Sequence, residues 1–574
     1  MEKRWTLVDA PMPAIKELEQ IKGMQPAIAR ILAQRGISNY ADASAFFNPD
    51  LDGLHDPFLM KDMRAATQRI LDARKKGERI LVYGDYDVDG TTSVACMYSF
   101  LLAQQIGSTV DFYVPNRHKE GYGISNAGIE FARENQYSLV IALDCGIKSV
   151  DLIRKASSHG IDFIVCDHHL PGQELPPALA ILNPKQAQCP YPFKELCGCG
   201  VGFKLISALA AELGLDKSYP YQYLDLVATA IAADIVPMTG ENRVMVFHGL
   251  AKVNQKPSLG IRAILEASGF QKKLTIQDLV FLIAPRINAA GRMDDARKVI
   301  RLFMETDEKE ALKIARDLQL DNTDRKKADS EATEQALSMI RADQAMLQGN
   351  ATVVYHPQWH KGVIGIVASR LIEQFYRPTI VLTNSGGVVS GSARSIPGFN
   401  LHDGLDACAD LLLGYGGHYF AAGMTLEASQ VKAFRDRFER IVRERLPEDM
   451  MFPEILVHAE LDFSGITEKF FRQLKRLEPF GPENPEPVFL TRGATMVGKS
   501  RIAKEKHLQF SMSRDGKIFK CFGFNLAQKQ SLLDGGPVHM VYTIDENEWN
   551  GSRSLQLKVL DLKAADATAI GPFR

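Results

Sequence analysis

Four short segments rich in β-branched residues restrict the possible folds of the chain most strongly. They read RILVYG at 79–84, TVDFYV at 109–114, SLVIALD at 138–144 and DFIVCD at 162–167. Each is followed by a polar or glycine-containing turn and then by a helix-like stretch. Strands that alternate with helices in this way usually pair in parallel. We therefore predict an α/β domain with a doubly wound parallel sheet, whose ligands bind beyond the carboxyl ends of the strands.

Three carboxylates follow the first strand directly. Asp85, Asp87 and Asp89 lie in DYDVDG at 85–90, and in an extended chain such alternate residues point to one side. Three converging anions repel one another unless a cation lies among them. A solvated acidic loop is the alternative. A calcium loop of the EF-hand type is excluded because its twelfth position, which must be glutamate, is Cys96.

Further ligand-type residues follow later elements. Asp144 ends SLVIALD, Asp167 is followed by His168 and His169, and Asp234 ends ATAIAAD. We expect these ends to share one edge of the sheet. Carboxylates with few imidazoles suit Mn²⁺ or Mg²⁺ better than zinc. Two ions about 4 Å apart would use so many ligands, in the hydrolysis of a phosphate ester. The residues therefore predict a two-metal phosphodiesterase.

DYDVDG, ALDCG, CDHH and the late AAD together resemble the four motifs of the DHH phosphoesterases, and the chain as a whole resembles the RecJ family within that superfamily. The resemblance implies that Asp144 bridges two ions. It implies that His169 contacts the scissile phosphate and that Asp167 orients the CDHH segment. The metal ligands that it implies are Asp85, Asp87, Asp89, Asp144, His168 and Asp234.

Basic and glycine-rich motifs further along the chain also resemble RecJ. They are RHKEGYG at 117–123, PRINAAGR at 285–292, GSARS at 391–395 and GGH at 416–418. Arginine offers two donors to phosphate oxygens, and glycine lets backbone N–H groups approach an anion. From the residues alone, a solvated turn, a helix cap or a tight packing turn remain alternatives. The resemblance implies that the nucleic-acid-binding residues are Arg117, Arg286, Asn288, Arg292, Ser392, Arg394 and His418.

Changes in pattern along the chain predict five parts. These are an N-terminal helical segment at 1–55, a DHH catalytic domain at 56–255, a helical connector at 256–345, a second α/β, DHH-associated domain at 346–447 and an all-β OB-fold at 448–574. The connector ends in a densely charged run without Gly or Pro, typical of a long bridging helix. The last part places basic residues among aromatics, as proteins that bind single strands do.

Overall composition adds little about function. Basic residues number 68 and acidic residues 69, so any contact with phosphates must come from local patches. Cys189, Cys197 and Cys199 lack a CxxC pair, which favours buried thiols over a zinc site. The N-terminus shows no signal-peptide pattern, and no run approaches the ~18 apolar residues of a membrane span. We expect a soluble, cytoplasmic protein.

The resemblance implies a metal-dependent exonuclease that degrades single-stranded DNA from 5′ to 3′, releases 5′-mononucleotides and acts in DNA recombination and repair. It also implies a monomer with single-strand-binding protein and a RecQ-type helicase as partners. One alternative is a small-substrate DHH phosphodiesterase acting on oligoribonucleotides or cyclic dinucleotides, which would generally lack the C-terminal β domain. The other is a non-catalytic DHH scaffold, which would have lost metal ligands.

Overall fold

The computed structural model describes residues 2–117, 119–549, 552–565 and 570–571. The chain forms two compact units. One contains Asp50–Glu448, and the other combines Met1–Pro49 with Asp449–Arg574. Among the described residues, no helix combines the length and the apolar character needed to cross a membrane.

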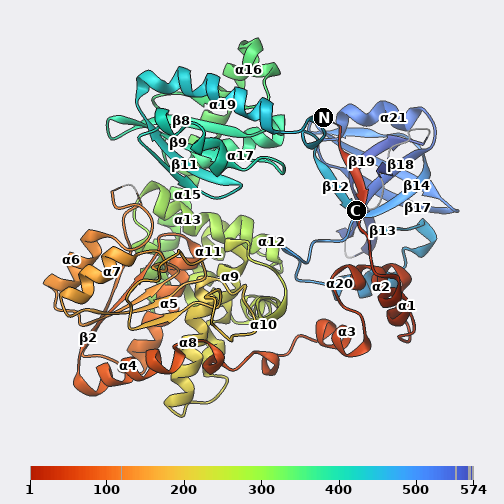
Figure 1. Cartoon of the computed structure of the whole chain (residues 1–574). Helices are drawn as coiled ribbons and strands as arrows, with labels where there is room; N and C mark the ends of the chain where they lie inside the picture. The colour runs from red at the N-terminus through yellow and green to blue at the C-terminus, as the bar shows by residue number, and fades with distance from the viewer. Residues whose placement is uncertain (1, 118, 550–551, 566–569, 572–574) are drawn as a thin grey trace. The chain divides into compact units, whose positions relative to one another are not determined.

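A five-stranded parallel sheet lies at the centre of the first half of the larger unit (Figure 1). Its spatial order is β3-β2-β4-β5-β6, with bounds Thr109–Tyr113, Arg79–Gly84, Leu139–Leu143, Asp162–Cys166 and Ala180–Leu182. The chain runs from β2 to β3 in one direction and then continues from β4 on the other side of β2. The connections therefore reverse between β2 and β4, where sheets of this type bind ligands. The predicted doubly wound sheet is confirmed, and β6 is a strand that the sequence did not predict.

The two faces of this sheet bury different side chains because alternate residues of a strand point to opposite faces. Leu81 and Val140 pack on the side of α6 (Asn126–Glu134) and α7 (Val150–Ser158). Ile80 and Ile141 belong to the core on the other side. That core also includes residues of α4 (Met63–Lys76), α5 (Val88–Ala103), α8 (Gly198–Glu212) and α9 (Leu224–Asp234). Full burial of one such aliphatic side chain stabilises the fold by ~1.5–3 kcal/mol. The helices therefore hold the strand ends in fixed positions.

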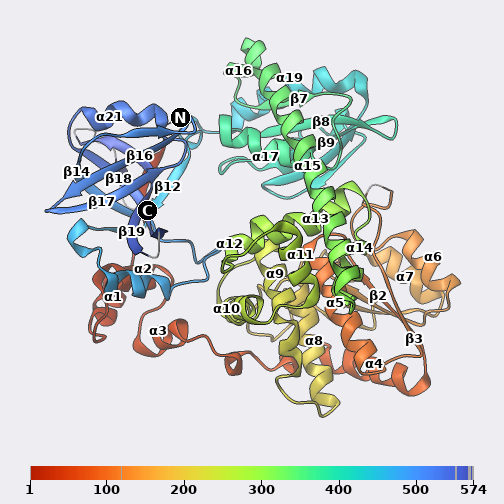
Figure 2. The ribbon, with the colours of Figure 1, turned by 180° about the vertical axis from the view of Figure 1, so that it is seen from behind.

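The helix α15 (Glu308–Ala342) has 35 residues, which corresponds to about 52 Å of helix. Asp307 is the N-cap of this helix, and its side chain accepts hydrogen bonds from backbone N–H groups of the first turn. Its first part packs against α11 (Leu259–Ser268) and α13 (Ala284–Met293), and it also packs against α17 (Ile364–Phe375) of the following domain (Figure 2). The predicted bridging helix is confirmed.

The second α/β part of the larger unit contains a mixed sheet of order β10-β11-β9-β8-β7. The strands are Gly414–Gly417, Ala421–Leu426, Val388–Arg394, Thr379–Ser385 and Thr352–Tyr355. Only the pair β7–β8 is parallel, so β9 to β11 form an antiparallel edge. The glycine-rich motifs at 391–395 and 416–423 lie on these antiparallel strands and on the turn between β10 and β11.

The smaller unit contains a seven-stranded sheet of order β13-β14-β18-β19-β17-β16-β15, which an additional pairing of β14 with β16 closes on itself. The strands are Ala459–Glu460, Phe489–Met496, Val538–Trp549, Ser552–Ala564, Lys517–Gly523, His507–Arg514 and Arg501–Ala503. Phe489 and Tyr542 lie in its core together with Leu18 and Leu32 from the N-terminal helices α1 (Met12–Glu19) and α2 (Pro26–Gln34). The predicted C-terminal β domain is confirmed.

The N-terminal segment contains the helices α1, α2 and α3 (Tyr40–Phe47), as the sequence predicts, but it begins with a strand that the sequence did not predict. Arg4–Leu7 forms β1, which lies between β12 (Glu454–Val457) and β20 (Ile570–Gly571) and is parallel to both. Trp5 is 0% exposed there, and its Nε1 donates to Asp561 Oδ2 at 3.0 Å. A four-residue strand whose partners lie more than 400 residues away carries no local signal.

Candidate metal centre and nucleic-acid interface

The predicted metal ligands gather at the carboxyl ends of the sheet. Asp85 follows β2, Asp144 follows β4, and Asp167 with His168 follows β5. Asp234 reaches the same place as the last residue of α9, so it comes from a helix and not from a strand of the sheet. The cluster lies at the reversal point between β2 and β4.

The acidic loop after β2 is not an extended strand. Asp87 is the N-cap of α5, where its side chain accepts a hydrogen bond from Gly90 N at 3.0 Å, and Asp89 already lies in the first helical turn. A Cβ on Gly90 would come within 2.4 Å of the carbonyl oxygen of Asp85, so only glycine fits this turn. The carboxylates therefore converge through a tight strand-to-helix turn, and the alternating geometry that the sequence suggested is wrong.

Asp89 is fixed by the N-terminus of α8. Its Oδ2 and Oδ1 accept hydrogen bonds from the backbone N–H groups of Gly198 and Cys199, both at 2.7 Å. These donors would be unsatisfied at a free helix end, and the dipole of the helix favours the carboxylate. Sequence reasoning missed this role of CGCG at 197–200. A Cys-Gly repeat opening an apolar helix is the signal that could have found it.

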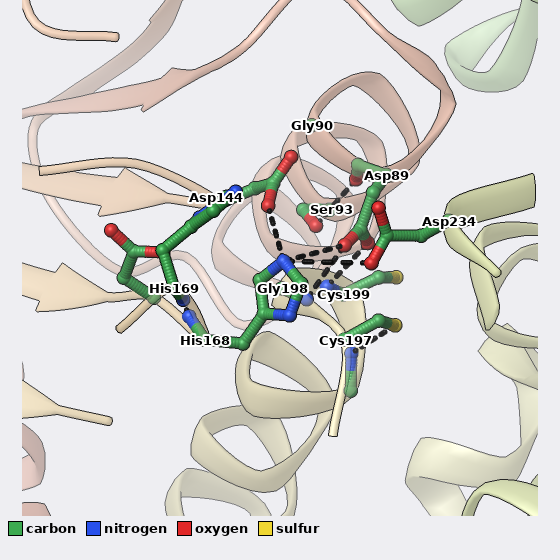
Figure 3. Close-up of polar contacts among 12 residues, drawn as sticks. Asp89, Gly90, Ser93, Asp144, His168, His169, Cys197, Gly198, Cys199 and Asp234 are labelled. Carbon is green, nitrogen blue, oxygen red and sulfur yellow. Dashed lines mark hydrogen bonds and ion pairs between the residues drawn. The ribbon is translucent and has the colours of Figure 1, made fainter. Parts of the chain in front are cut away.

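His168 lies at the centre of the cluster, with its imidazole between Asp144 on one side and Asp89 and Asp234 on the other (Figure 3). Its Nε2 is 3.2 Å from Asp144 Oδ1, 3.5 Å from Asp234 Oδ2 and 3.8 Å from Asp89 Oδ2. Neither ring nitrogen, nor Asp144 Oδ1, has a hydrogen-bond partner among the described residues. Burial lowers the pKa of His168, so the neutral ring keeps a lone pair for a metal ion.

The neighbouring carboxylates repel one another inside a buried site. Burial, and then the charges of Asp89 and Asp87, raise the pKa of Asp144 well above its usual value. The same causes raise the pKa of Asp234 to about 9. Burial and the charge of Asp87 also raise the pKa of Asp85 well above its usual value. A divalent cation would remove this repulsion.

The described ligand atoms form two groups, within each of which all atoms lie within 4.8 Å of one another. One group is Asp89, His168 and Asp234, and the other is Asp144, His168 and His169. Neither contains Asp85 or Asp87, which lie beside the groups on the β2–α5 turn. Oxygen ligands with one or two imidazoles fit Mn²⁺ or Mg²⁺, as the sequence predicts.

Asp167 and His169 form a second, hydrogen-bonded pair next to the cluster. Asp167 accepts from the backbone N–H groups of Ile147, His168 and His169, and its Oδ1 lies 2.8 Å from His169 Nδ1. Burial opposes ionisation of Asp167, but the hydrogen bonds outweigh burial and lower its pKa to about 2. Burial would lower the pKa of His169, yet the hydrogen bond from this ring to Asp167 and the Asp167 charge raise it. The pair is therefore an ionised carboxylate and a readily protonated imidazole.

Tyr122 is a site residue that sequence reasoning did not single out. Its hydroxyl donates to the carbonyl oxygen of Asp144 at 2.9 Å and lies 3.2 Å from His169 Nδ1. It thereby links the loop after β4 to the histidine. The motif RHKEGYG, which contains it, could have directed attention to this residue.

Three of the predicted DNA-binding arginines lie close together beside the cluster, and we call Arg117, Arg292 and Arg394 the arginine row. Burial, and then the charges of Arg117 and other arginines, lower the pKa of Arg292 to about 10. Burial and the charge of Arg117 also lower the pKa of Arg394. Such mutual repulsion favours an anion between the guanidinium groups. Ser392 Oγ accepts from Arg394 Nη1 at 3.2 Å and belongs to the same place.

The other predicted DNA-binding residues have different surroundings. Arg286 is buried, and it donates to Gln319 Oε1 at 2.7 Å and to the carbonyl oxygen of Leu282 at 2.5 Å, so it joins α13 to α15. Asn288 is half-buried on α13. His418 is exposed between β10 and β11.

The three clustered cysteines are buried thiols, as the sequence favours. Cys197 is the N-cap of α8 and accepts from Gly200 N at 3.3 Å. Cys189 Sγ accepts from Lys61 N at 3.4 Å. No cysteine belongs to a metal-binding group within the described part of the chain.

The fold and the cluster define a DHH phosphoesterase. Profiles of three families match this chain: "DHH family, N-terminal domain" at residues 79–231, "DHHA1 domain" at 348–444 and "RecJ OB domain" at 457–561. The first profile spans the elements that carry every predicted metal ligand except Asp234, which follows its end by three residues.

Similarity over the full length narrows the class. The chain is 37% identical over 568 residues to the single-stranded-DNA-specific exonuclease RecJ of Bacillus subtilis, which covers 98% of this chain and 71% of that protein. It is 34% identical to the RecJ of Escherichia coli, over 93% of this chain and 95% of the relative. The chain belongs to the RecJ family of single-stranded-DNA-specific exonucleases.

Solved structures agree with this placement. The crystal structure of Thermus thermophilus RecJ in complex with Mn²⁺ superposes with a TM-score of 0.84 at 30% identity and covers 98% of this chain and 80% of that one. The structure of the same protein with Mg²⁺ gives a TM-score of 0.79 at 29% identity. These are the two ions that the ligand set of this chain favours.

Proposed function

We propose that this chain is a metal-dependent exonuclease that hydrolyses single-stranded DNA from the 5′ end, releases 5′-mononucleotides and acts in DNA recombination and repair. The observation that carries the proposal is the buried cluster of Asp89, Asp144, His168 and Asp234 directly beside the arginine row. The names of the relatives support the substrate. The 5′-to-3′ direction and the 5′-mononucleotide product rest on the family resemblance read from the sequence.

We assign the binding of two Mn²⁺ or Mg²⁺ ions to the whole carboxylate set together with His168, and the family resemblance assigns Asp144 to both ions. The orphaned buried atoms Asp85 Oδ1, Asp144 Oδ1 and both ring nitrogens of His168 support this assignment, because each needs a partner that the described residues do not supply. A bound divalent ion would act as a Lewis acid and lower the pKa of water, which is the chemistry that phosphodiester hydrolysis needs. The ligands are Asp85, Asp87, Asp89, Asp144, His168 and Asp234.

His169 and Asp167 act on the scissile phosphate in this proposal. The raised pKa of His169 favours an imidazolium, which donates a charge-assisted hydrogen bond to a phosphate oxygen. Asp167 Oδ1 lies 2.8 Å from His169 Nδ1 and holds the ring in place. Hydrogen bonds from backbone N–H groups keep the Asp167 carboxylate ionised. The carboxylate therefore both orients and charges the histidine.

The arginine row holds the DNA backbone next to the ions. Arg117 lies over the ring of Tyr86, with 4.7 Å between its Cζ and the ring centroid, so its guanidinium is kept near the β2–α5 turn. Arg394 comes from the DHH-associated domain, so a bound phosphate would contact both domains of the larger unit. The assigned nucleic-acid-binding residues are Arg117, Arg286, Asn288, Arg292, Ser392, Arg394 and His418.

We divide the chain functionally into an N-terminal segment at 1–55, a catalytic domain at 56–255, a connector at 256–345, a DHH-associated domain at 346–447 and an OB-fold at 448–574. The three profile matches fall inside the second, fourth and fifth ranges, which supports the division. We further propose a cytoplasmic monomer that acts with single-strand-binding protein and a RecQ-type helicase. These last assignments rest on the family resemblance.

Degradation of end-labelled oligonucleotides tests the proposal. Single strands labelled at the 5′ or the 3′ end are incubated with Mn²⁺, beside duplex DNA and RNA. We expect immediate release of a labelled mononucleotide from the 5′ label, with duplex DNA spared. Release restricted to RNA or to very short oligomers would instead indicate the small-substrate alternative, and no metal-dependent hydrolysis would sink the proposal.

A matched pair of variants connects the activity to the site. Asp144→Ala should abolish turnover, while Asp151→Ala should not, because Asp151 is an exposed residue of α7 whose carboxylate meets Arg154 at the surface. Circular dichroism of both variants checks that the fold is kept. Retained Mn²⁺-dependent activity in Asp144→Ala would contradict the assignment of the metal ligands.

A further inference from the structure

The turn between β10 and β11 exposes two adjacent aromatic side chains. Tyr419 is 39% exposed and Phe420 is 52% exposed, and their ring centroids are 4.6 Å apart at an angle of 60°. Burial of these rings would be favourable, so leaving both open to solvent forgoes stability. The two rings lie on the surface of the larger unit and are available to a ligand.

The aromatic pair is joined to the arginine row by the backbone. β11 lies next to β9 in the sheet (Figure 1). Their register places Ala421 opposite Arg394. One residue further, the carbonyl oxygen of Phe420 accepts from Ser395 N at 3.0 Å. Phe420 is therefore the sequence neighbour of Ala421, the residue that pairs with Arg394.

The DHH-associated domain also contacts the helical connector. Arg292 Nη1 donates to the carbonyl oxygen of Gly362 at 3.0 Å. Three residues along, a Cβ on Gly365 would lie 2.9 Å from Ser392 Oγ and 3.1 Å from Arg394 Nη2, so the Arg394 side chain lies against the start of α17. Arg292, on α13 of the connector, and Arg394, on β9, therefore both approach the segment at 362–365, which leads into α17. The aromatic pair directly precedes β11, the strand that pairs with the strand of Arg394.

His418 directly precedes the aromatic pair in the turn. Burial, and then the positive charges of Lys148 and His169, lower its pKa. Lys148 follows β4 and His169 follows β5, so the charges that act on His418 come from the loops after these two strands.

We propose that Tyr419 and Phe420 form a base-binding surface, which stacks on an unpaired nucleobase of the DNA strand whose phosphates the arginine row holds. The inference rests on the proposed function. Every base has a π-face, so aromatic side chains beside a cationic groove bind single strands irrespective of sequence. A base inside a duplex has both faces covered by its neighbours and cannot make this contact. The pair therefore favours single strands through the base, while the arginines recognise only the backbone.

Tyr419 and Phe420 differ in the hydrogen bonds that they make within the turn. Tyr419 Oη accepts from Gly398 N at 3.2 Å, and its carbonyl oxygen accepts from Leu401 N at 3.0 Å. The ring of Phe420 is the more exposed of the two and is apolar. Phe420 is therefore the better residue to change, because its substitution alters the surface and leaves these hydrogen bonds of the turn in place.

The experiment compares intact and abasic substrates. Single-stranded oligonucleotides carry one abasic residue at each of the first four positions from the 5′ end in turn, and KM and kcat are measured with Mn²⁺. For the wild-type chain we expect one abasic position to raise KM about tenfold, the size of one lost stacking contact. Phe420→Ala should raise KM for the intact strand about tenfold, with a smaller change in kcat, and should abolish the difference between intact and abasic strands.

Phe420→Leu keeps an apolar side chain and removes the ring, so it should behave like Phe420→Ala. An unchanged KM in Phe420→Leu, or an abasic penalty that persists in it, would overturn the inference, even if Phe420→Ala failed to fold. Tyr419→Phe, which keeps the ring, should retain the wild-type abasic penalty. Failure of the proposed function is a different result, since the wild-type chain would then hydrolyse no single strand at all.

Discussion

Substitution of Gly198 by alanine tests the geometry of the metal centre most directly. A Cβ at this position would lie 2.6 Å from the Cβ of Asp144 and 2.7 Å from its Oδ1. Carbon atoms pack at about 3.5–4.0 Å, so either the start of α8 or the Asp144 side chain must move by roughly 1 Å. The added methyl group also meets the Cα of Asp144 at 2.8 Å, so a change of rotamer alone does not relieve the contact.

The displacement affects two metal ligands at once, because the N–H groups of Gly198 and Cys199 also hold Asp89 at 2.7 Å. A misplacement of about 1 Å in a catalytic site costs about 100-fold in rate. Forcing an extra methyl group into a packed site lowers the free energy of unfolding by about 1–3 kcal/mol. We therefore expect Gly198→Ala to lower kcat about 100-fold, to require more Mn²⁺ for half-maximal activity and to unfold at a lower temperature.

Gly200→Ala is the matched control in the same helical turn. A Cβ on Gly200 would lie no closer than 3.4 Å to any neighbour, the nearest atoms being those of the Leu196 side chain. Alanine stabilises a compatible helical position by about 0.4–1 kcal/mol relative to glycine, so this variant should keep wild-type activity and stability. The assays are release of nucleotides from end-labelled single strands, a Mn²⁺ titration and thermal unfolding. Wild-type kcat and Mn²⁺ dependence in Gly198→Ala would refute the reasoning, and equal losses in both variants would show that any side chain in this turn is harmful.

Three further predictions concern the stability of the two units. Trp5→Ala should lower the free energy of unfolding of the smaller unit by about 3–5 kcal/mol in chemical denaturation, because a fully buried indole and its bond to Asp561 are lost; a change below about 1 kcal/mol would contradict the role of β1. The pKa of Asp234 rises from about 4 in the unfolded chain to about 9 in the fold, so without metal its contribution to stability is complete below pH ~4 and is lost as the pH rises to about 9. Metal-free Asp234→Asn should therefore have a higher Tm than the metal-free wild type at pH ~8 and a flatter decline of Tm between pH ~5 and ~9, and identical pH profiles would count against this. Lys204 Nζ lies 2.5 Å from Glu241 Oε1, and both side chains are 2% exposed. Glu241→Gln should lower the free energy of unfolding in denaturant by about 3–5 kcal/mol, because it leaves the buried ammonium without its counter-charge. A cost near zero would show that Lys204 is neutral in the fold.

Most of the fold prediction rested on short local patterns. These were the β-branched segments, the charged run and the acidic turn. RILVYG, TVDFYV, SLVIALD and DFIVCD are β2 to β5, and the run at 305–344 is α15 within a few residues. The type of each of these elements follows from the periodicity and composition of ten to forty neighbouring residues. Tertiary packing is consistent with these local preferences. The ligand types could be predicted because carboxylates and histidines recur after successive elements of the chain.

Other features depended on contacts between distant residues and left no local signal. Asp234 enters the site at the end of a helix, and the carboxylates after β2 converge through an N-cap turn, where an extended strand was expected. β1 exists only because β12 and β20, hundreds of residues away in sequence, offer it edges to pair with. The two β-branched or aromatic residues of RWTL are too few to predict a strand without them.

The sequence by itself determined which chemistry the chain can perform, because carboxylates and imidazoles at strand ends select hard divalent ions wherever they meet. The tertiary structure decided how these groups meet. It placed Gly198 against Asp144 without room for a methyl group and put the N–H groups of α8 on Asp89. It also brought Arg292 of the connector and Arg394 of the DHH-associated domain together. These contacts form between segments that are far apart in the sequence, and they depend on close packing to within a fraction of an ångström. A pattern of neighbouring residues therefore cannot predict them.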